Sequence, residues 1–158
     1  MPAAREAGWD LPSPHVIALT VGPEDIDAYR HVNNAVYMRW FDEVAWSHSA
    51  ALGLPIERCL ELDRGMAVLR SLISYIRPAL ENDELRIATW ILPREGLRVS
   101  RRFQVLRPAD GATLARAHVE YACIELSSGR PARWPAPFME RYRPLEAVLA
   151  GYPALAPL

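Results

Sequence analysis

The sequence predicts an α+β fold in which one antiparallel sheet wraps around a single long helix. A strongly apolar helical pattern covers residues 34–52 and follows one strand-like segment. Four more strand-like segments come after it, and the connections between them are short. Because a parallel crossover needs a dozen or more residues, short connections predict antiparallel neighbours. A helix that is apolar on most sides must be covered by other structure, and the sheet is the simplest cover.

Strands are predicted where β-branched and aromatic residues run between Pro, Gly and Asp residues. The first strand is expected at residues 15–21, and an acidic, Pro-containing loop covers residues 22–33. The strands after the helix are predicted at residues 66–77, 84–92, 97–106 and 112–126. We also expect a short edge strand at residues 132–134 and one helical turn at residues 145–150.

The helix prediction rests on its two ends and on its apolar spacing. Asn33 is placed to cap the first turn, and Gly53 and Pro55 are typical residues to follow the last turn. Apolar side chains recur at intervals of three and four residues through the segment. The stripe consists of Val36, Tyr37, Trp40, Phe41, Val44, His48, Ala51 and Leu52. We expect His48 to be a packed histidine with a hydrogen-bond partner.

Length and composition indicate one folded domain. The chain has 158 residues, and domains are typically about 100–150 residues long. Hydrophobic residues make up 51% and charged residues 23%, which is typical of a globular chain. We expect a flexible N-terminal arm at 1–14, the domain at 15–142 and a tail at 143–158. The strand at 66–77 is apolar on both faces, which predicts a homodimer or a larger assembly.

Charge and residue pattern exclude several classes of protein. The net charge is −1, with 18 basic and 19 acidic side chains, so the basic excess of a nucleic-acid binder is missing. No run approaches the roughly 18 apolar residues of a membrane span, and the N-terminus lacks a signal-peptide core. We therefore expect a cytoplasmic protein without a membrane partner. Cys59 and Cys123 lack disulfide-framework or metal-site spacing, so no metal is expected.

The side chains best suited to chemistry lie in residues 25–40, with the sequence DIDAYRHVNNAVYMRW. The first N–H groups of a helix have no partner within it, and with the helix dipole they favour negative charge. A carbonyl oxygen placed there would be polarised, and the oxyanion of an acyl transfer would be stabilised. Asp27 could act as a general base on water or as a nucleophile on the carbonyl. The pattern therefore predicts a hydrolase for an ester-like acyl compound.

The segment also resembles a known family. Its pattern, D-x-D-x-[aromatic]-x-H-V-N-N-A-x-Y from Asp25 to Tyr37, is similar to that of the hot-dog fold thioesterases. It is most similar to the acyl-CoA thioesterase branch that includes 4-hydroxybenzoyl-CoA thioesterase, and more distantly to plant acyl-carrier-protein thioesterases. The resemblance covers residues 16–143. It implies a hot-dog fold, a dimer or tetramer with its site between subunits, and hydrolysis of acyl-CoA, in which coenzyme A is part of the substrate and no cofactor is needed.

The resemblance also implies roles for single residues. The family's catalytic carboxylate falls on Asp27, and its helix-start amide, which contacts the thioester oxygen, falls on or near Asn34. His31 matches a histidine that helps activation or substrate positioning in the carrier-protein branch. The candidate substrate contacts are Tyr29, Asn33 and Tyr37, although Asn33 is also the expected cap and Tyr37 also suits the core. Tyr29 replaces a catalytic Asn of the plant branch, and Arg30 stands where many relatives have Gly.

Arginines supply the candidate contacts to the phosphates of coenzyme A. The cluster consists of Arg94, Arg98, Arg101 and Arg102, and we assign the contact to Arg94, Arg98 and Arg101. A guanidinium group forms paired, charge-assisted bonds to phosphate oxygens. A solvated strand edge is the alternative interpretation. Two alternative functions also remain open: a thioesterase acting on acyl-carrier-protein thioesters, and a non-catalytic acyl-binding protein of the same fold.

Overall fold

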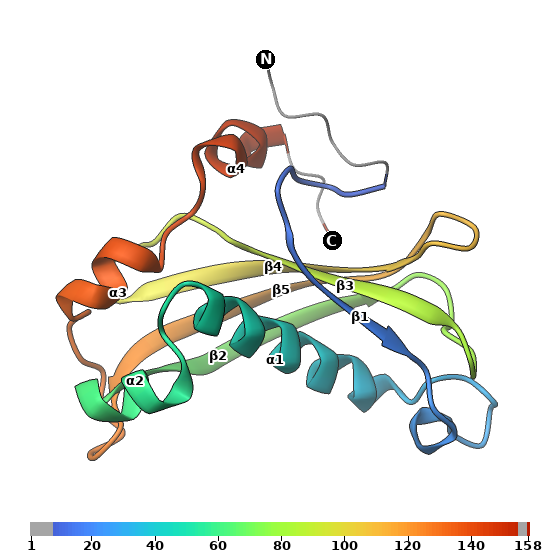
Figure 1. Cartoon of the computed structure of the whole chain (residues 1–158), viewed down its shortest axis with the longest axis horizontal. Helices are drawn as coiled ribbons and strands as arrows, with labels where there is room; N and C mark the ends of the chain where they lie inside the picture. Colours follow the sequence, from blue (N-terminus) through green and yellow to red (C-terminus); the bar gives the residue numbers. More distant parts are fainter. Residues whose placement is uncertain (1–7, 155–157) are drawn as a thin grey trace.

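The computed structural model describes residues 8–154 and residue 158. A single five-stranded antiparallel sheet, with the strand order β1-β3-β4-β5-β2, curves around one long helix, α1 (Asn34–Ala51) (Figure 1). The strands are β1 (His15–Thr20), β2 (Arg64–Tyr75), β3 (Glu84–Ile91), β4 (Arg98–Arg107) and β5 (Ala112–Glu125). The predicted α+β fold is confirmed, and the ends of these five strands lie within two residues of the predicted ones.

Helix α1 begins and ends where the sequence predicts. The side chain of Asn33 accepts a hydrogen bond from the Ala35 N–H at 2.9 Å, which caps the first turn. At the other end, Gly53 has a left-handed backbone with φ of 83°, a conformation that favours glycine. The Leu54 N–H then bonds to the Ser49 carbonyl at 2.8 Å, which closes the last turn. The cap and the glycine therefore set the length of α1.

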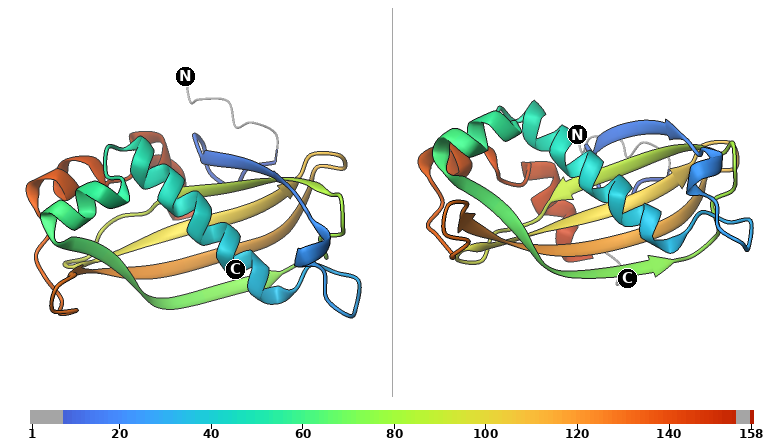
Figure 2. Two further views of the ribbon diagram at one scale, coloured as in Figure 1. Left: turned by 60° about the horizontal axis from the view of Figure 1, so that its bottom comes forward. Right: turned by 90° about the horizontal axis from the view of Figure 1, so that it is seen from below.

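The main core lies between α1 and the concave face of the sheet. Figure 2 shows α1 running diagonally across the strands, which curve around it. Trp40, Phe41 and Val44 of α1 are buried, and the Phe41 ring packs at 4.9 Å on that of Phe103 in β4. Burial of apolar surface contributes about 25 cal/mol per Å², so this interface supplies much of the stability of the fold.

A second, smaller core covers part of the convex face. Trp9 and Leu11 from the N-terminal segment are buried there with Trp90 of β3. Val148 joins them from α4 (Glu146–Gly151), the helical turn predicted in the tail. Residues 8–14 are thus packed, contrary to the loose arm that we expected, because two large apolar side chains find a complementary strand surface. The other parts of the predicted arm and tail, residues 1–7 and 155–157, lie outside the described residues.

Two short helices were not predicted, and one predicted strand is wrong. Helix α2 (Ile56–Leu62) follows α1, and α3 (Ala136–Arg141) follows the sheet. Residues 132–134 form no strand, and only an isolated bridge joins Ile124 to Pro131. Trp134 is instead buried and packs edge-on against Phe138 of α3. Tertiary packing of an aromatic side chain has replaced the strand pairing suggested by local sequence.

Strand β2 forms one edge of the sheet and exposes apolar side chains. It pairs with β5 alone, and its register shifts between Val68 and Arg70. The exposed large apolar side chains of the strand and its C-terminal end are Val68, Leu69, Leu72, Tyr75 and Ile76. A free strand edge with exposed apolar groups is a surface suited to pairing with another chain.

Candidate active site

Asp25 anchors the loop that leads into α1. Its side chain is only 5% exposed and forms an ion pair with the guanidinium of Arg39 on α1. The Gly22 N–H donates to the other carboxylate oxygen at 3.3 Å, and the Asn33 N–H donates to the Asp25 carbonyl at 2.9 Å. This carboxylate therefore joins both ends of the loop to the helix.

Asp27 lies in a tight turn two residues further on. Its Oδ1 accepts a hydrogen bond from the Tyr29 N–H at 2.9 Å, and its own N–H donates to the His31 carbonyl at 2.9 Å. Arg30 closes the turn with a left-handed φ of 62°, which is the conformation that glycine adopts most easily. The Asp27 side chain is half-buried, and Tyr29 is 84% exposed.

The start of α1 opens onto a hollow with a volume of about 220 Å³. Its lining residues are His31, Val32, Asn34, Tyr37, Tyr75, Ile76, Arg77 and Pro78. Tyr75 of β2 donates its hydroxyl to the Asn34 carbonyl at 2.9 Å, and its ring packs edge-on against that of Tyr37 at 5.2 Å. The end of β2 and the first turn of α1 are therefore held together at this hollow.

The first turn of α1 leaves a peptide donor beside this hollow. Asn33 accepts the N–H groups of both Ala35 and Val36, through its side chain and its carbonyl respectively. No acceptor for the N–H of Asn34 is found in the described part of the chain. Burial raises the pKa of Tyr37, whose hydroxyl accepts from the Ala79 N–H at 3.2 Å, so this tyrosine stays neutral at pH 7. The positive end of the helix dipole and the guanidinium of Arg77, which lines the hollow, therefore both favour negative charge there.

The structure gathers some of the predicted site residues and separates others. His31, Asn34 and Tyr37 share the hollow, whereas Asp27, Tyr29 and Asn33 are not among its lining residues. Five lining residues were not predicted as site residues. Val32 lies in the predicted motif itself, and the other four come from the end of β2 and the residues just after it, namely Tyr75, Ile76, Arg77 and Pro78. These four lie about 40 residues further along the chain, and only their position at the end of an apolar strand could have suggested them.

The arginine cluster divides between the surface and the interior. Arg94 and Arg98 are exposed, and the Arg94 guanidinium lies 5.1 Å from the Trp134 ring. Arg101 is 0% exposed and faces α1 from the concave side of β4. Its guanidinium binds Tyr142, His48, Thr89 and Ser49. The assignment of Arg101 to a phosphate contact is therefore wrong, because its strand position turns it into the core.

Two further observations concern metals and membranes. Within residues 8–154 and residue 158, no group of three or more His, Cys, Asp or Glu side chains is arranged to hold a metal ion. None of the helices in that part of the chain is long and apolar enough to cross a bilayer.

The fold is of the hot-dog class, with one antiparallel sheet wrapped around a central helix. A family model described as the thioesterase-like superfamily matches residues 21–142, so the chain belongs to that superfamily. The resemblance seen in the sequence is thereby confirmed. No curated protein matches the chain.

Solved structures share this fold at low sequence identity. The 1,4-dihydroxy-2-naphthoyl-CoA thioesterase Slr0204 from Synechocystis has a TM-score of 0.73 and 19% identity, over 82% of this chain and 95% of that chain. The protein SAV2348 from Staphylococcus aureus, solved in complex with CoA, has a TM-score of 0.76 and 19% identity, over 94% of this chain and 89% of that chain. The gentisyl-coenzyme A thioesterase BH1999 has a TM-score of 0.71 and 19% identity, over 78% of this chain and 98% of that chain.

Proposed function

We propose that this protein hydrolyses acyl-CoA thioesters to the free acid and coenzyme A. The observation that carries the proposal is the Asn34 N–H, which has no partner in the described residues and lies at the start of α1 beside a hollow of about 220 Å³. Family membership supports thioester chemistry. Two similar structures are CoA thioesterases and a third was solved with CoA, which supports CoA as the carrier.

In the proposed reaction, the thioester carbonyl oxygen lies against the Asn34 N–H. Negative charge develops on this oxygen as the carbonyl is attacked, and the helix dipole stabilises it. Asp27 acts in one of two ways: it takes a proton from the attacking water, or it attacks the carbonyl to form an anhydride that water then hydrolyses. His31 lines the hollow and positions the substrate. The sulfur leaves with coenzyme A.

We further propose that a second copy completes the site. The hollow is bounded by Tyr75 and Ile76, which are exposed large apolar residues at the end of β2. A second chain docked on this edge would cover these side chains and narrow the opening around the thioester. The exposed Arg94 and Arg98 remain candidates for the phosphates of coenzyme A.

Thiol release from a panel of short, long and aromatic acyl-CoA thioesters tests the proposal. The wild-type protein should release free thiol from at least one of them. Asp27→Asn should lower kcat by roughly 100-fold or more, the usual scale of a lost general base, while the far-UV circular dichroism stays unchanged. Glu24→Gln is the matched control, because Glu24 is an exposed carboxylate in the same loop, and it should keep full activity.

The other outcomes separate the remaining alternatives. Full activity in Asp27→Asn would remove Asp27 from the mechanism. Turnover of acyl-carrier-protein thioesters without turnover of acyl-CoA would show that the substrate is an acyl-carrier-protein thioester. Saturable binding of acyl-CoA without any thiol release would mark a non-catalytic acyl-binding protein.

A further inference from the structure

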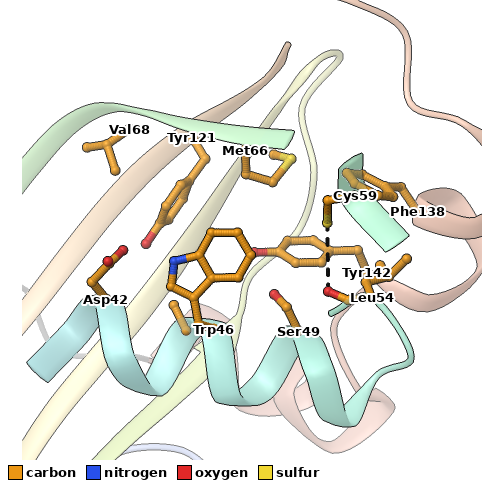
Figure 3. A pocket seen from close by; sticks show the side chains of 11 residues that line it. Asp42, Trp46, Ser49, Leu54, Cys59, Met66, Val68, Tyr121, Phe138 and Tyr142 are labelled. Carbon is orange, nitrogen blue, oxygen red and sulfur yellow. Dashed lines mark hydrogen bonds between the residues drawn. The ribbon is translucent and has the colours of Figure 1, made fainter. Parts of the chain in front are cut away.

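A second cavity lies near the other end of α1. Its volume is about 70 Å³, and it lies between α1, β2, β5 and α3 and is partly open to solvent (Figure 3). Its walls include Trp46, Met66 and Phe138, and its polar groups include Ser49 and Tyr142. Ser49 is 15 residues after Asn34, which corresponds to roughly 22 Å along a helix that rises about 1.5 Å per residue. This cavity is therefore separate from the hollow at the start of α1.

The polar side of the cavity is supported by the fully buried Arg101. Its Nε donates to the Tyr142 hydroxyl at 2.8 Å, and its Nη2 donates to the Ser49 hydroxyl at 3.4 Å. Its Nη1 bonds to Nδ1 of His48 at 2.9 Å and to the Thr89 hydroxyl at 3.3 Å. Every one of these partners is a hydroxyl or an imidazole. Within the described residues, Arg101 forms no ion pair with a carboxylate.

This arrangement leaves a positive charge without a counter-ion. A guanidinium only donates hydrogen bonds, so Nδ1 of His48 must accept and the imidazole is neutral. Burial and the neighbouring Arg101 lower the pKa of His48 to about 3, in agreement with this geometry. Burying an unpaired charge is costly, and an anion placed beside it would offset part of that cost.

The same bonds also fix the direction of two hydroxyl groups. Ser49 Oγ and Tyr142 Oη accept from Arg101, so each keeps its own O–H for another acceptor. No acceptor for either hydroxyl is found in the described part of the chain. Figure 3 shows the Ser49 side chain rising from α1 toward the cavity, with Tyr142 among the side chains that face it. The hydroxyl groups of Ser49 and Tyr142 can therefore donate into the cavity, and the buried guanidinium of Arg101 lies behind them.

We infer that this cavity binds the carboxylate of a small aliphatic acid, which accepts hydrogen bonds from Ser49 and Tyr142 beside Arg101. The apolar tail extends past Trp46 and Val68, which are exposed at the opening. The exposed Asp42 also lines this opening, and its charge disfavours the reversed orientation. The cavity is smaller than the roughly 150 Å³ that holds a benzene ring, so an unbranched acid fits better than an aromatic one. This site does not depend on thioester hydrolysis.

Isothermal titration calorimetry with hexanoate at pH 7 tests the inference. Hexanoate should bind saturably, and hexanamide, which has a similar shape but no charge, should bind at least about tenfold more weakly. Ser49→Ala and Tyr142→Phe should each weaken hexanoate binding by about tenfold, since each removes a bond to a charged group. Arg101→Met should abolish the preference for the acid over the amide.

Two matched variants test whether removing any similar hydroxyl group weakens hexanoate binding through a general effect on the protein. Ser47→Ala removes a hydroxyl from the same helix that bonds to His15 Nε2 at 2.8 Å, and Tyr152→Phe alters a tyrosine that is exposed. Both should bind hexanoate as the wild type does, and thermal unfolding should confirm that every variant is folded. The inference is overturned if the wild type does not bind hexanoate, if hexanamide binds equally well, or if Ser47→Ala weakens binding as much as Ser49→Ala. Ser49→Ala and Tyr142→Phe keep the test decisive if Arg101→Met does not fold.

Discussion

Asp25 and Asp27 are separated by one residue, yet their surroundings are opposite. Asp25 is buried, and both of its carboxylate oxygens are occupied by Arg39 and the Gly22 N–H. The half-buried Asp27 accepts one local hydrogen bond, from the Tyr29 N–H to Oδ1. A carboxylate that is fully bonded inside the protein cannot reach a substrate. Of the two, Asp27 is therefore the one available for chemistry.

His48 shows a different use of a titratable side chain. Its Nδ1 accepts from Arg101 at 2.9 Å, and its ring stacks on that of His15 at 4.8 Å between centroids. Its pKa in the folded protein is about 3, because of burial and the neighbouring guanidinium, against 6.5 in the unfolded chain. Below pH 6.5 the unfolded chain therefore binds more protons at this position. The stability contributed by neutral His48 is complete above pH 6.5 and is lost as the pH falls toward 3.

We therefore predict that the free energy of unfolding falls less steeply with acid in His48→Asn. Asn offers an acceptor to Arg101 but does not titrate, so it removes this proton linkage while keeping a polar partner. Urea unfolding of both proteins at several pH values between about 7 and 4 measures the difference. If the free energy of unfolding changed with pH in the same way in wild type and variant, His48 would not titrate as the geometry requires.

At the scale of the element, α1 links both candidate sites. Its first turn provides the Asn34 N–H at the hollow, and its later turns provide Trp46 and Ser49 at the second cavity. One helix can contribute to both sites because its buried apolar side chains hold it on the sheet. Its first turn and its exposed side remain accessible to a ligand. The position of its first turn therefore matters for the reaction as well as for stability.

Asn33→Ala should destabilise the protein by about 1 kcal/mol, the typical value of a lost N-cap. The reason is that the Ala35 N–H loses its acceptor, the Asn33 side chain. Chemical denaturation measures the change. Asn34→Ala is the matched control, because no hydrogen bond to the Asn34 side chain is found in the described residues and only its backbone carbonyl accepts from Tyr75. Equal destabilisation by both variants would contradict the capping role of Asn33.

At the scale of the whole molecule, different segments cover the two faces of the sheet, and the edge at β2 keeps exposed apolar side chains. The concave face is filled by α1, and part of the convex face is covered by residues 8–14 and α4. Strand β2 is the edge that keeps a row of exposed apolar side chains. The helix α1, residues 8–14 and α4 thus cover much of the sheet. Strand β2 keeps its exposed apolar side chains, and it is the surface on which we propose that a second copy docks.

Leu72→Glu should weaken the proposed assembly. Leu72 is 58% exposed on β2, and a carboxylate there would have to be desolvated in a subunit interface. Analytical ultracentrifugation at micromolar concentration should give at least twice the chain mass for the wild type and a lower mass for the variant. Leu60→Glu is the control, since Leu60 is 62% exposed but lies on α2. A wild-type protein that sediments as a monomer would contradict the proposal.

Local sequence predicts those features that depend on neighbours along the chain. The N-cap at Asn33, the glycine after α1 and five of the six predicted strands are confirmed. Arg101 was assigned to a phosphate contact because it belongs to a cluster of arginines, but strand alternation and the position of α1 bury it. Trp134 was assigned to a strand, but its aromatic partners are in α3 and at its end.

The sequence by itself determined the α+β fold, the long central helix and the segment from Asp25 to Tyr37 that indicates the family. These follow from periodicity, capping and turn residues, which act over a few positions of the chain. Only the tertiary structure decided which side chains share a cavity, as with Tyr75 beside Asn34 and Arg101 behind Ser49. Such contacts join residues about 40 to 50 positions apart, and they depend on strand order and strand facing, which no short segment specifies.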